Sequence, residues 1–194
     1  MRVESKAGIV GWGGYIPRWR IKVGEIAKLW GFSPETARDL GIEERAGAGV
    51  DEDAVTTGWE AARNALARAG VDPAEIGAVW FGTKSKPYAV KPSATIVAEA
   101  LGIPPSKMAS DLEFACRAAS EALRISIGAV ASGLVKYTLV IGSDTAQANP
   151  GDVLEFTASS AAAAFVVGPA VNSAAVFEAS YTYVTDTPDF WRRD

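Results

Sequence analysis

Short apolar runs alternate with longer amphipathic segments along most of the chain. The runs over 7–17 (AGIVGWGGYIP), 77–83 (GAVWFGT) and 136–144 (KYTLVIGSD) are bounded by turn residues, which is typical of buried strands. Residues 53–70 form the clearest predicted helix, and Gly70 marks its end. Its apolar positions recur at spacings of three and four: Val55, Trp59, Ala62, Leu66 and Ala69.

The remaining predicted elements are shorter. We expect helices over 22–31, 91–102 and 116–133 and strands over 106–112, 158–168 and 173–185. The last two strands are expected to form a hairpin turned at 168–172. Residues 32–53 are polar and glycine-rich, so we expect them to form an excursion on the surface. Residues 116–133 are apolar or small nearly all round, which predicts a helix buried on most sides. This order predicts an α/β layered fold with a mixed, mostly parallel sheet and a buried central helix.

Composition narrows the class of protein. The 194 residues are 48% hydrophobic and 22% charged with a net charge of −4, so we expect a folded domain without the basic surface of a nucleic-acid binder. Two short basic clusters, residues 18–22 and 84–91, are interpreted as solvated surface, although either could hold an anion. The sequence shows neither a signal peptide nor a membrane span, and we expect a cytoplasmic protein with no membrane partner.

One cysteine and no histidine limit the possible chemistry. A single cysteine excludes an internal disulfide and a cysteine-cluster metal site, and it fits a reducing compartment. The absence of histidine excludes a histidine base, a histidine metal ligand and a Ser–His–Asp triad within this chain. We expect no metal site and no bound cofactor.

Cys116 stands between a predicted strand and the predicted helix 116–133, in the stretch SDLEFACRAAS. A thiol at a helix start faces free backbone N–H groups, which stabilise anionic sulfur and an oxyanion on an attached acyl group. A free cysteine is also a common small core residue. Local context leaves both interpretations open.

Three other segments carry weaker signals. The Lys- and Pro-rich loop 81–92 follows a predicted strand at the end of the sheet where α/β proteins build sites, but it is also typical of solvated surface. The small residues within 149–165 permit close approach either of a ligand or of a packed layer. The glycines of 11–14 match neither the dinucleotide nor the P-loop spacing, so we assign no nucleotide motif.

Six segments together resemble a known family, the archaeal-type hydroxymethylglutaryl-CoA synthases of the thiolase superfamily, over their N-terminal half. The matching segments are GIVGWGGYIPRWRIKVGEIAKLWG, DEDAVTTGWEAARNAL, VWFGTKSKPYAVKPSATIVAEALG, DLEFACRAASEAL, KYTLVIGSDTAQANPGDVLEFTASSAAAAFVVG and YTYVTDTPDFWRR. The resemblance implies a five-layer αβαβα sandwich of which residues 1–194 supply the first half. The terminal aromatics Phe190 and Trp191 would then dock on this domain or lead into a second half.

The resemblance also implies an activity and its residues. The family condenses acetyl-CoA with acetoacetyl-CoA and water to hydroxymethylglutaryl-CoA and CoA, in the mevalonate route to isoprenoids. Cys116 matches the nucleophile that carries the acetyl group, and Thr157 matches a substrate-binding threonine. Lys84, in GTKS, stands where the family's GTES motif has its general-base glutamate. The family's catalytic histidine belongs to the C-terminal half.

The departures from the family leave alternatives open. Lysine at 84 could act as a base only if strongly desolvated, and Ser159–Ala162 replace a glycine-rich stretch, so any position there that needs φ > 0 would be strained. The chain could therefore be the nucleophile-bearing half of an enzyme or a degenerate binding or scaffold subunit. A type III ketoacyl synthase is a third candidate, which YAVKPSATIVAEALG and LEFTA disfavour. Expected partners are a C-terminal half, a second copy, an acetoacetyl-CoA thiolase and a small bridging protein.

Overall fold

A six-stranded mixed sheet forms the centre of the protein. The computed structural model describes residues 6–186, and the sheet has the strand order β5-β4-β6-β7-β1-β8. Its strands are β1 (Ala7–Tyr15), β4 (Ile76–Gly82), β5 (Met108–Leu112), β6 (Tyr137–Thr145), β7 (Ser160–Pro169) and β8 (Ala175–Val176). Strands β5, β4, β6 and β1 run in one direction, whereas β7 and β8 run in the other, as the sequence predicts for a mixed, mostly parallel sheet.

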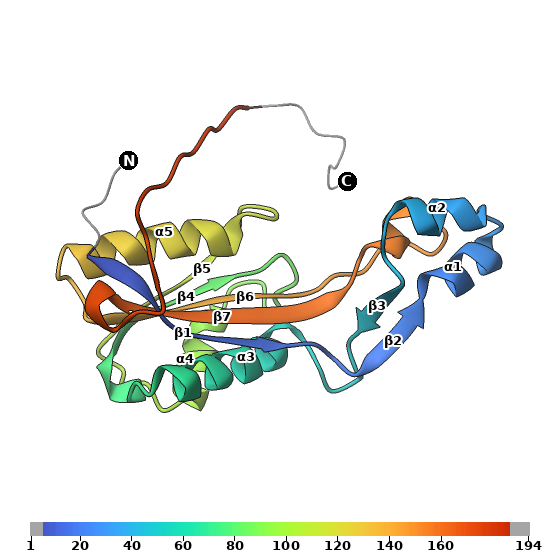
Figure 1. The fold of residues 1–194 in the computed structure, drawn as a ribbon. Coiled ribbons are helices and arrows are strands. Elements are labelled where there is room, and N and C mark those ends of the chain that lie inside the picture. Colours follow the sequence, from blue (N-terminus) through green and yellow to red (C-terminus); the bar gives the residue numbers. More distant parts are fainter. Residues whose placement is uncertain (1–5, 187–194) are drawn as a thin grey trace.

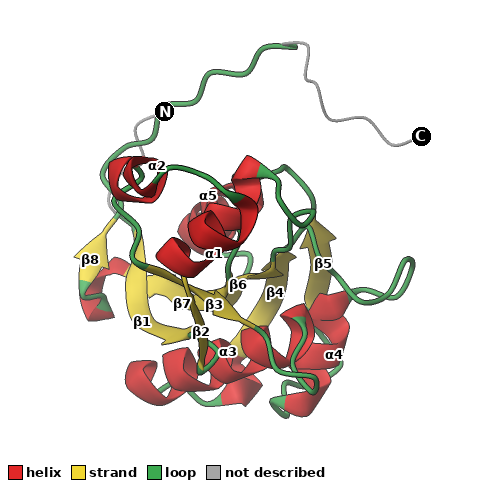
Figure 2. Ribbon diagram, turned by 90° about the vertical axis from the view of Figure 1, so that its right-hand side faces the viewer, coloured by secondary structure: helices red, strands yellow, loops and turns green. Residues whose placement is uncertain are grey.

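Helices cover both faces of this sheet (Figures 1 and 2). Helix α5 (Ala118–Ala131) lies on one face, and α3 (Ala54–Ala69) and α4 (Ser93–Ala100) lie on the other. The sheet side under α3 and α4 holds the larger apolar core, which includes Phe81 and Ile141, and α5 packs on a smaller one. The described residues therefore form three layers, α/β/α.

Helix α3 begins and ends as its sequence predicts. The Asp53 carboxylate accepts from the Thr56 N–H at 2.8 Å and the Thr56 hydroxyl accepts from the Asp53 N–H, which makes a capping box. Gly70 closes the helix at φ 61°, in the left-handed region that favours glycine.

Two glycines of β1 allow α3 to pack close to the sheet. A Cβ at Gly11 would lie 2.6 Å from the Ala65 carbonyl oxygen, and one at Gly13 would lie 2.2 Å from that of Ala61. Both positions are buried under the helix. These glycines therefore serve helix–strand packing, which agrees with assigning no nucleotide loop to them.

A small lobe projects from the sheet beyond β1 (Figure 1). It contains β2 (Trp19–Lys22), α1 (Val23–Trp30), α2 (Pro34–Asp39) and β3 (Glu44–Gly47), and β2 pairs with β3 in an antiparallel ladder. The 3₁₀ turn Val153–Phe156 closes the lobe, because the fully buried Phe156 packs on α1 and meets the Phe32 ring edge-to-face at 5.2 Å between centroids. The surface excursion expected over 32–53 thus belongs to this lobe, but it contains a helix and a strand, α2 and β3, that the sequence analysis did not predict.

The prediction of a C-terminal hairpin is wrong. Strand β7 is paired along both edges, with β6 on one side and β1 on the other, so it has no free edge for a following strand. After the 3₁₀ turn Ala170–Asn172, the short β8 pairs with β1 instead. The chain then leaves the sheet and rises past α5 (Figure 1). Phe190 and Trp191 lie outside the described residues.

Helix α5 is less enclosed than its composition predicts. It begins at Ala118 rather than Cys116, and Ala118, Ala122 and Ser126 face the sheet while Ile125 and Gly128 are exposed. In the described part of this chain, α5 is thus a covering layer of the sheet, buried on one side.

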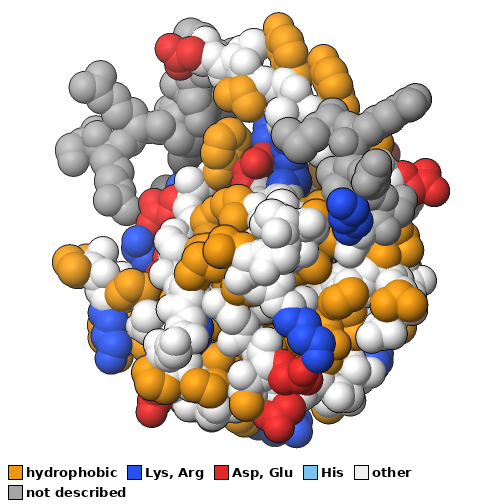
Figure 3. All heavy atoms as spheres, turned by 90° about the vertical axis from the view of Figure 1, so that its left-hand side faces the viewer, with side chains coloured by type: hydrophobic (Ala, Val, Ile, Leu, Met, Phe, Trp, Pro, Cys, Tyr) orange, Lys and Arg blue, Asp and Glu red, His pale blue; other side chains and the backbone are white. Residues whose placement is uncertain are grey.

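The surface at the end of the molecule opposite the β2–β3 lobe mixes the two signs of charge. Figure 3 shows acidic and basic side chains interspersed among hydrophobic ones on this face. Within residues 6–186, no helix combines the length and the apolar character that crossing a bilayer requires.

Candidate active site

Cys116 lies in the turn between β5 and α5, beyond the carboxyl ends of β4 and β6. Its side chain is exposed and lines two adjoining cavities of about 470 and 620 Å³ that share Ala115, Cys116 and Asp144. The first cavity is walled by the small residues of β7 and by Gly82 and Gly142, and the second by Lys84, Ser85 and residues 145–147. The structure therefore rejects a core role for this thiol and places it in an open site at the end of the sheet.

The turn that carries Cys116 is strained. Ala115 has φ 43°, the one positive φ among the described non-glycine residues. Such a conformation costs an alanine about 1–2 kcal/mol and persists only where the surroundings enforce it. The Arg117 N–H donates to the Phe114 carbonyl at 2.9 Å and closes the turn around Cys116. The N-cap residue Arg117 makes no side-chain cap, so within residues 6–186 its side chain does not occupy the N–H groups of the first turn of α5, next to the thiol.

Glycines at paired positions of β4 and β6 let α5 approach the sheet beside Cys116. Gly82 and Gly142 are register partners, and a Cβ on either would collide with Ala119, at 2.5 Å from its nitrogen and 2.8 Å from its Cβ respectively. The small residues at the start of α5 and these two glycines thus fit together. Their packing fixes the height of the Cys116 turn above the sheet.

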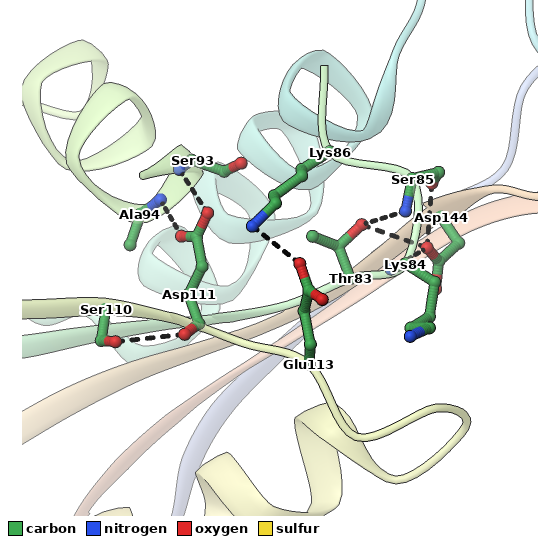
Figure 4. Close-up of polar contacts among 10 residues, drawn as sticks. All are labelled: Thr83, Lys84, Ser85, Lys86, Ser93, Ala94, Ser110, Asp111, Glu113 and Asp144. Atoms are coloured by element: carbon green, nitrogen blue, oxygen red, sulfur yellow. Dashed lines mark hydrogen bonds and ion pairs between the residues drawn. The ribbon is translucent and has the colours of Figure 1, made fainter. Parts of the chain in front are cut away.

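Asp144 organises the loop that bears Lys84 (Figure 4). Its Oδ1 accepts from the Thr83 hydroxyl at 3.1 Å, the Lys84 N–H at 2.7 Å and the Ser85 hydroxyl at 2.9 Å. The Ser85 hydroxyl in turn accepts from the Thr145 N–H at 2.9 Å. One half-buried carboxylate therefore ties the end of β4 to the end of β6 and sets the path of residues 83–85.

Two further contacts join this loop to the segment before Cys116. The Lys86 ammonium pairs with the Glu113 carboxylate at 2.7 Å, and this hydrogen bond raises the pKa of Lys86. The Asp111 carboxylate accepts from the N–H groups of Ser93 and Ala94 at 2.7 and 2.8 Å and caps α4 (Figure 4). The β4–α4 loop and the β5–α5 turn are thus held to each other.

The predicted site residues are only partly brought together. Cys116 and Lys84 line the same cavity, and Lys84 is exposed. Thr157 lines neither cavity; it is exposed at the end of the 3₁₀ turn Val153–Phe156, where its hydroxyl donates to the Leu154 carbonyl at 3.3 Å. Its role as a substrate-binding residue stays a prediction.

The small residues of β7 pack into the core on one side of the sheet and border a cavity on the other. Ala162 and Ala164 are buried in the core under α3, whereas Ala161 and Ala163 are exposed. Ala161, Ala162 and Ala163 line the cavity that Cys116 also lines. None of Ser159–Ala162 has a positive φ, so the expected condition for strain there is not met. The side chains of this stretch narrow the cavity without straining its backbone.

Sequence reasoning missed Asp144, the most connected side chain of the site. An aspartate directly after a buried strand at the carboxyl edge of a sheet is the signal that could have identified it. Among the described residues, no three His, Cys, Asp or Glu side chains are grouped so that they could hold a metal ion. The chemistry this arrangement offers is that of an accessible thiol beside helix N–H groups and a lysine.

Several curated proteins similar to this chain carry the same description. The hydroxymethylglutaryl-CoA synthase of Aeropyrum pernix is 70% identical over 190 residues, which are 98% of this chain and 53% of that protein. The hydroxymethylglutaryl-CoA synthase of Pyrococcus furiosus is 58% identical over 194 residues, 100% of this chain and 54% of that protein. The chain spans about half the length of the curated relatives it matches. No protein-family model matches it.

Solved structures show the same fold. MvaS in complex with 3-hydroxy-3-methylglutaryl coenzyme A has a TM-score of 0.80 and 27% identity, covering 85% of this chain and 40% of that chain. The priming β-ketosynthase of the R1128 polyketide pathway has a TM-score of 0.79 and 33% identity, covering 87% of this chain and 52% of that chain. The fold is thus thiolase-like. The 70% identity to a curated synthase, against 33% to this ketosynthase, favours the synthase branch.

Proposed function

Because the chain matches the N-terminal half of archaeal hydroxymethylglutaryl-CoA synthases over nearly its whole length, we propose that it is the nucleophile-bearing half of such an enzyme. The reaction would join acetyl-CoA, acetoacetyl-CoA and water into hydroxymethylglutaryl-CoA and CoA. The observation that carries this proposal is the place of Cys116: exposed, in a strained turn, one residue before the N-cap of α5 and at the wall of two cavities.

In the first step, the Cys116 sulfur attacks the acetyl carbonyl carbon of acetyl-CoA. The carbonyl oxygen becomes an oxyanion beside the first-turn N–H groups of α5, which stabilise it. The C–S bond to CoA then breaks, CoA leaves as a thiol, and the acetyl group remains on Cys116 as a thioester.

In the second step, the acetyl methyl loses a proton and its carbon bonds to the ketone carbon of acetoacetyl-CoA. Water then cleaves the thioester, which releases hydroxymethylglutaryl-CoA and restores the thiol. An ammonium group has no lone pair, and Lys84 is exposed, so we infer that Lys84 does not remove this proton. A group other than Lys84 must therefore act as the base in the condensing step.

The test is condensation by the chain together with a C-terminal half taken from the Aeropyrum pernix relative. We expect hydroxymethylglutaryl-CoA to form slowly with the natural chain and about 10²- to 10⁴-fold faster with Lys84→Glu, the range typical of a general base. Cys116→Ser is the matched control and should give no product. If Lys84→Glu gains nothing although the two halves form a complex, the assignment of this position to the base is wrong.

A second candidate is a binding or scaffold subunit without turnover. Lysine at the position of the base, and Ser159–Ala162 in place of a glycine-rich stretch, favour it. It predicts that Cys116 accepts no acetyl group and that no variant condenses, while the chain still binds its partner half or a CoA thioester.

The wider setting belongs to the same proposal. Its small-molecule partners would be acetyl-CoA and acetoacetyl-CoA, with no metal or other cofactor, in the cytoplasmic mevalonate route to isoprenoids. A separate C-terminal half, a second copy of the chain, an acetoacetyl-CoA thiolase and a small bridging protein are the protein partners we propose.

A further inference from the structure

The Arg117 side chain, next to the thiol, makes three contacts that the proposed chemistry does not use. Its guanidinium carbon lies 4.7 Å from the centre of the Phe114 ring. The same group donates to the Glu121 carboxylate one turn along α5 and, at 2.8 Å, to the Thr182 hydroxyl. Arg117 thus joins the residue at the start of the Cys116 turn, the first turns of α5 and a residue 65 positions later in the chain.

Residues 177–182 are themselves held against α5 upstream of Thr182. The Phe177 N–H donates to the Ala7 carbonyl at 3.1 Å, and the Phe177 side chain packs against the apolar cluster under α5. Ala179 and Ser180 face Ile125 and Gly128 across a groove of about 250 Å³. The segment is therefore anchored at Phe177 and reaches the Cys116 turn through Arg117.

We propose that Arg117 is a positioning residue that couples the segment 177–182 to the Cys116 turn. The inference rests on the proposed function in one respect, namely that Cys116 is the acyl-accepting thiol. Ala115 holds a positive φ that its neighbours must enforce. Arg117 binds Phe114 across the cysteine in two ways, through its own N–H to the Phe114 carbonyl and through its guanidinium over the Phe114 ring. Thr182 then restricts the guanidinium to this place.

The Arg117–Glu121 ion pair is only half-buried, so the pair by itself is expected to contribute modestly to stability. Arg124 provides the comparison, because its guanidinium also lies near the Glu121 carboxylate, at 3.6 Å. Arg124 lies two turns along α5, and its ion pair with Glu121 does not involve the Cys116 turn. If a cation beside Glu121 were all that mattered, replacing either arginine would have a similar effect.

The test is the rate at which iodoacetamide alkylates the 194-residue chain, which reports on Cys116 alone because the chain has one cysteine. We expect Arg117→Met to slow alkylation about two- to fivefold, since the thiol loses its alignment with the start of α5 and a nearby cation. Arg117→Lys should recover part of the rate. Thr182→Val should slow alkylation less, and adding it to Arg117→Met should change nothing further, because the two residues act through one contact.

Arg124→Met is the matched control and should alkylate like the natural chain. Equal rates for Arg117→Met and Arg124→Met would overturn the proposal, and so would an effect of Thr182→Val that is undiminished in the Arg117→Met background. The assay uses no acyl-CoA, so it separates the two ideas. If Arg117→Met slows alkylation but the natural chain accepts no acetyl group, the proposed function alone is contradicted. If the natural chain accepts an acetyl group but Arg117→Met alkylates at the natural rate, the positioning role alone is contradicted.

Discussion

Gly82→Ala tests whether the contact between α5 and the sheet sets the height of the Cys116 turn. A Cβ at position 82 would lie 2.5 Å from the Ala119 nitrogen and 2.8 Å from the Ala118 carbonyl carbon, both backbone atoms. Ordinary contact begins at 3.4 Å, so the start of α5 must move by about 0.9 Å (3.4 − 2.5). Overpacking of this kind typically costs about 1–3 kcal/mol.

The assay is urea unfolding followed by tryptophan fluorescence, for which the chain has six tryptophans. With a slope of about 2 kcal/mol per molar urea, the expected cost lowers the unfolding midpoint by about 0.5–1.5 M. A displacement near 1 Å can cost a site about 10²-fold in rate, so acyl transfer to Cys116 should fall by up to that factor.

Gly128→Ala is the matched control, because position 128 lies on the same helix with nothing within 4 Å of an added Cβ. Alanine favours a helix over glycine by about 1 kcal/mol, so this variant should be as stable as the natural chain or more so. A Gly82→Ala chain with an unchanged midpoint and an unchanged Cys116 reactivity would refute the reasoning.

Two further outcomes follow from the contacts within α3 and α5. Asp53→Ala removes the cap of α3 and should lower the free energy of unfolding by about 1 kcal/mol, seen as a melting temperature lower by about 2–4 °C. Asp53→Asn keeps a hydrogen-bond acceptor and should lose much less stability. Equal losses of stability in the two variants would exclude the cap as the cause. The hydrogen bond from Arg117 lowers the pKa of Glu121, so the stability this pair provides is present at neutral pH and is lost as the pH falls below about 4, through the lowered pKa. Glu121→Gln should therefore be less stable than the natural chain at pH 7, and unfolding titrations should show that difference shrinking towards pH 3; a constant difference would contradict this account.

Most of the layered fold follows from local patterns. The periodicity of 53–70 and its end signals predict α3 almost to the residue, and the apolar runs predict β1, β4 and β6. The side chains of these elements determine them locally, because the helix buries one apolar stripe and each strand buries apolar side chains on its faces. Two features that local patterns miss are non-local: β7 has no free edge because β1, far earlier in the chain, occupies it, and β3 exists because β2 lies beside it.

The site, like the fold, has features that local sequence predicts and features that depend on contacts between distant segments. Cys116 at a helix start and Lys84 at a strand end could be selected from local context and resemblance, and they do share a cavity. The match between Gly82, Gly142 and Ala119, and the three hydrogen bonds to Asp144, depend on the register of β4 with β6, which no single segment specifies.

The most direct test of the central claim is whether Cys116 accepts an acetyl group. The chain is incubated with acetyl-CoA, alone and together with the C-terminal half of a relative, and the peptide that contains Cys116 is examined by mass spectrometry. The account predicts one acetyl group on that peptide, absent from Cys116→Ser and removed by hydroxylamine as a thioester should be. A peptide that stays unmodified under both conditions, in a folded chain whose thiol still reacts with iodoacetamide, would contradict it.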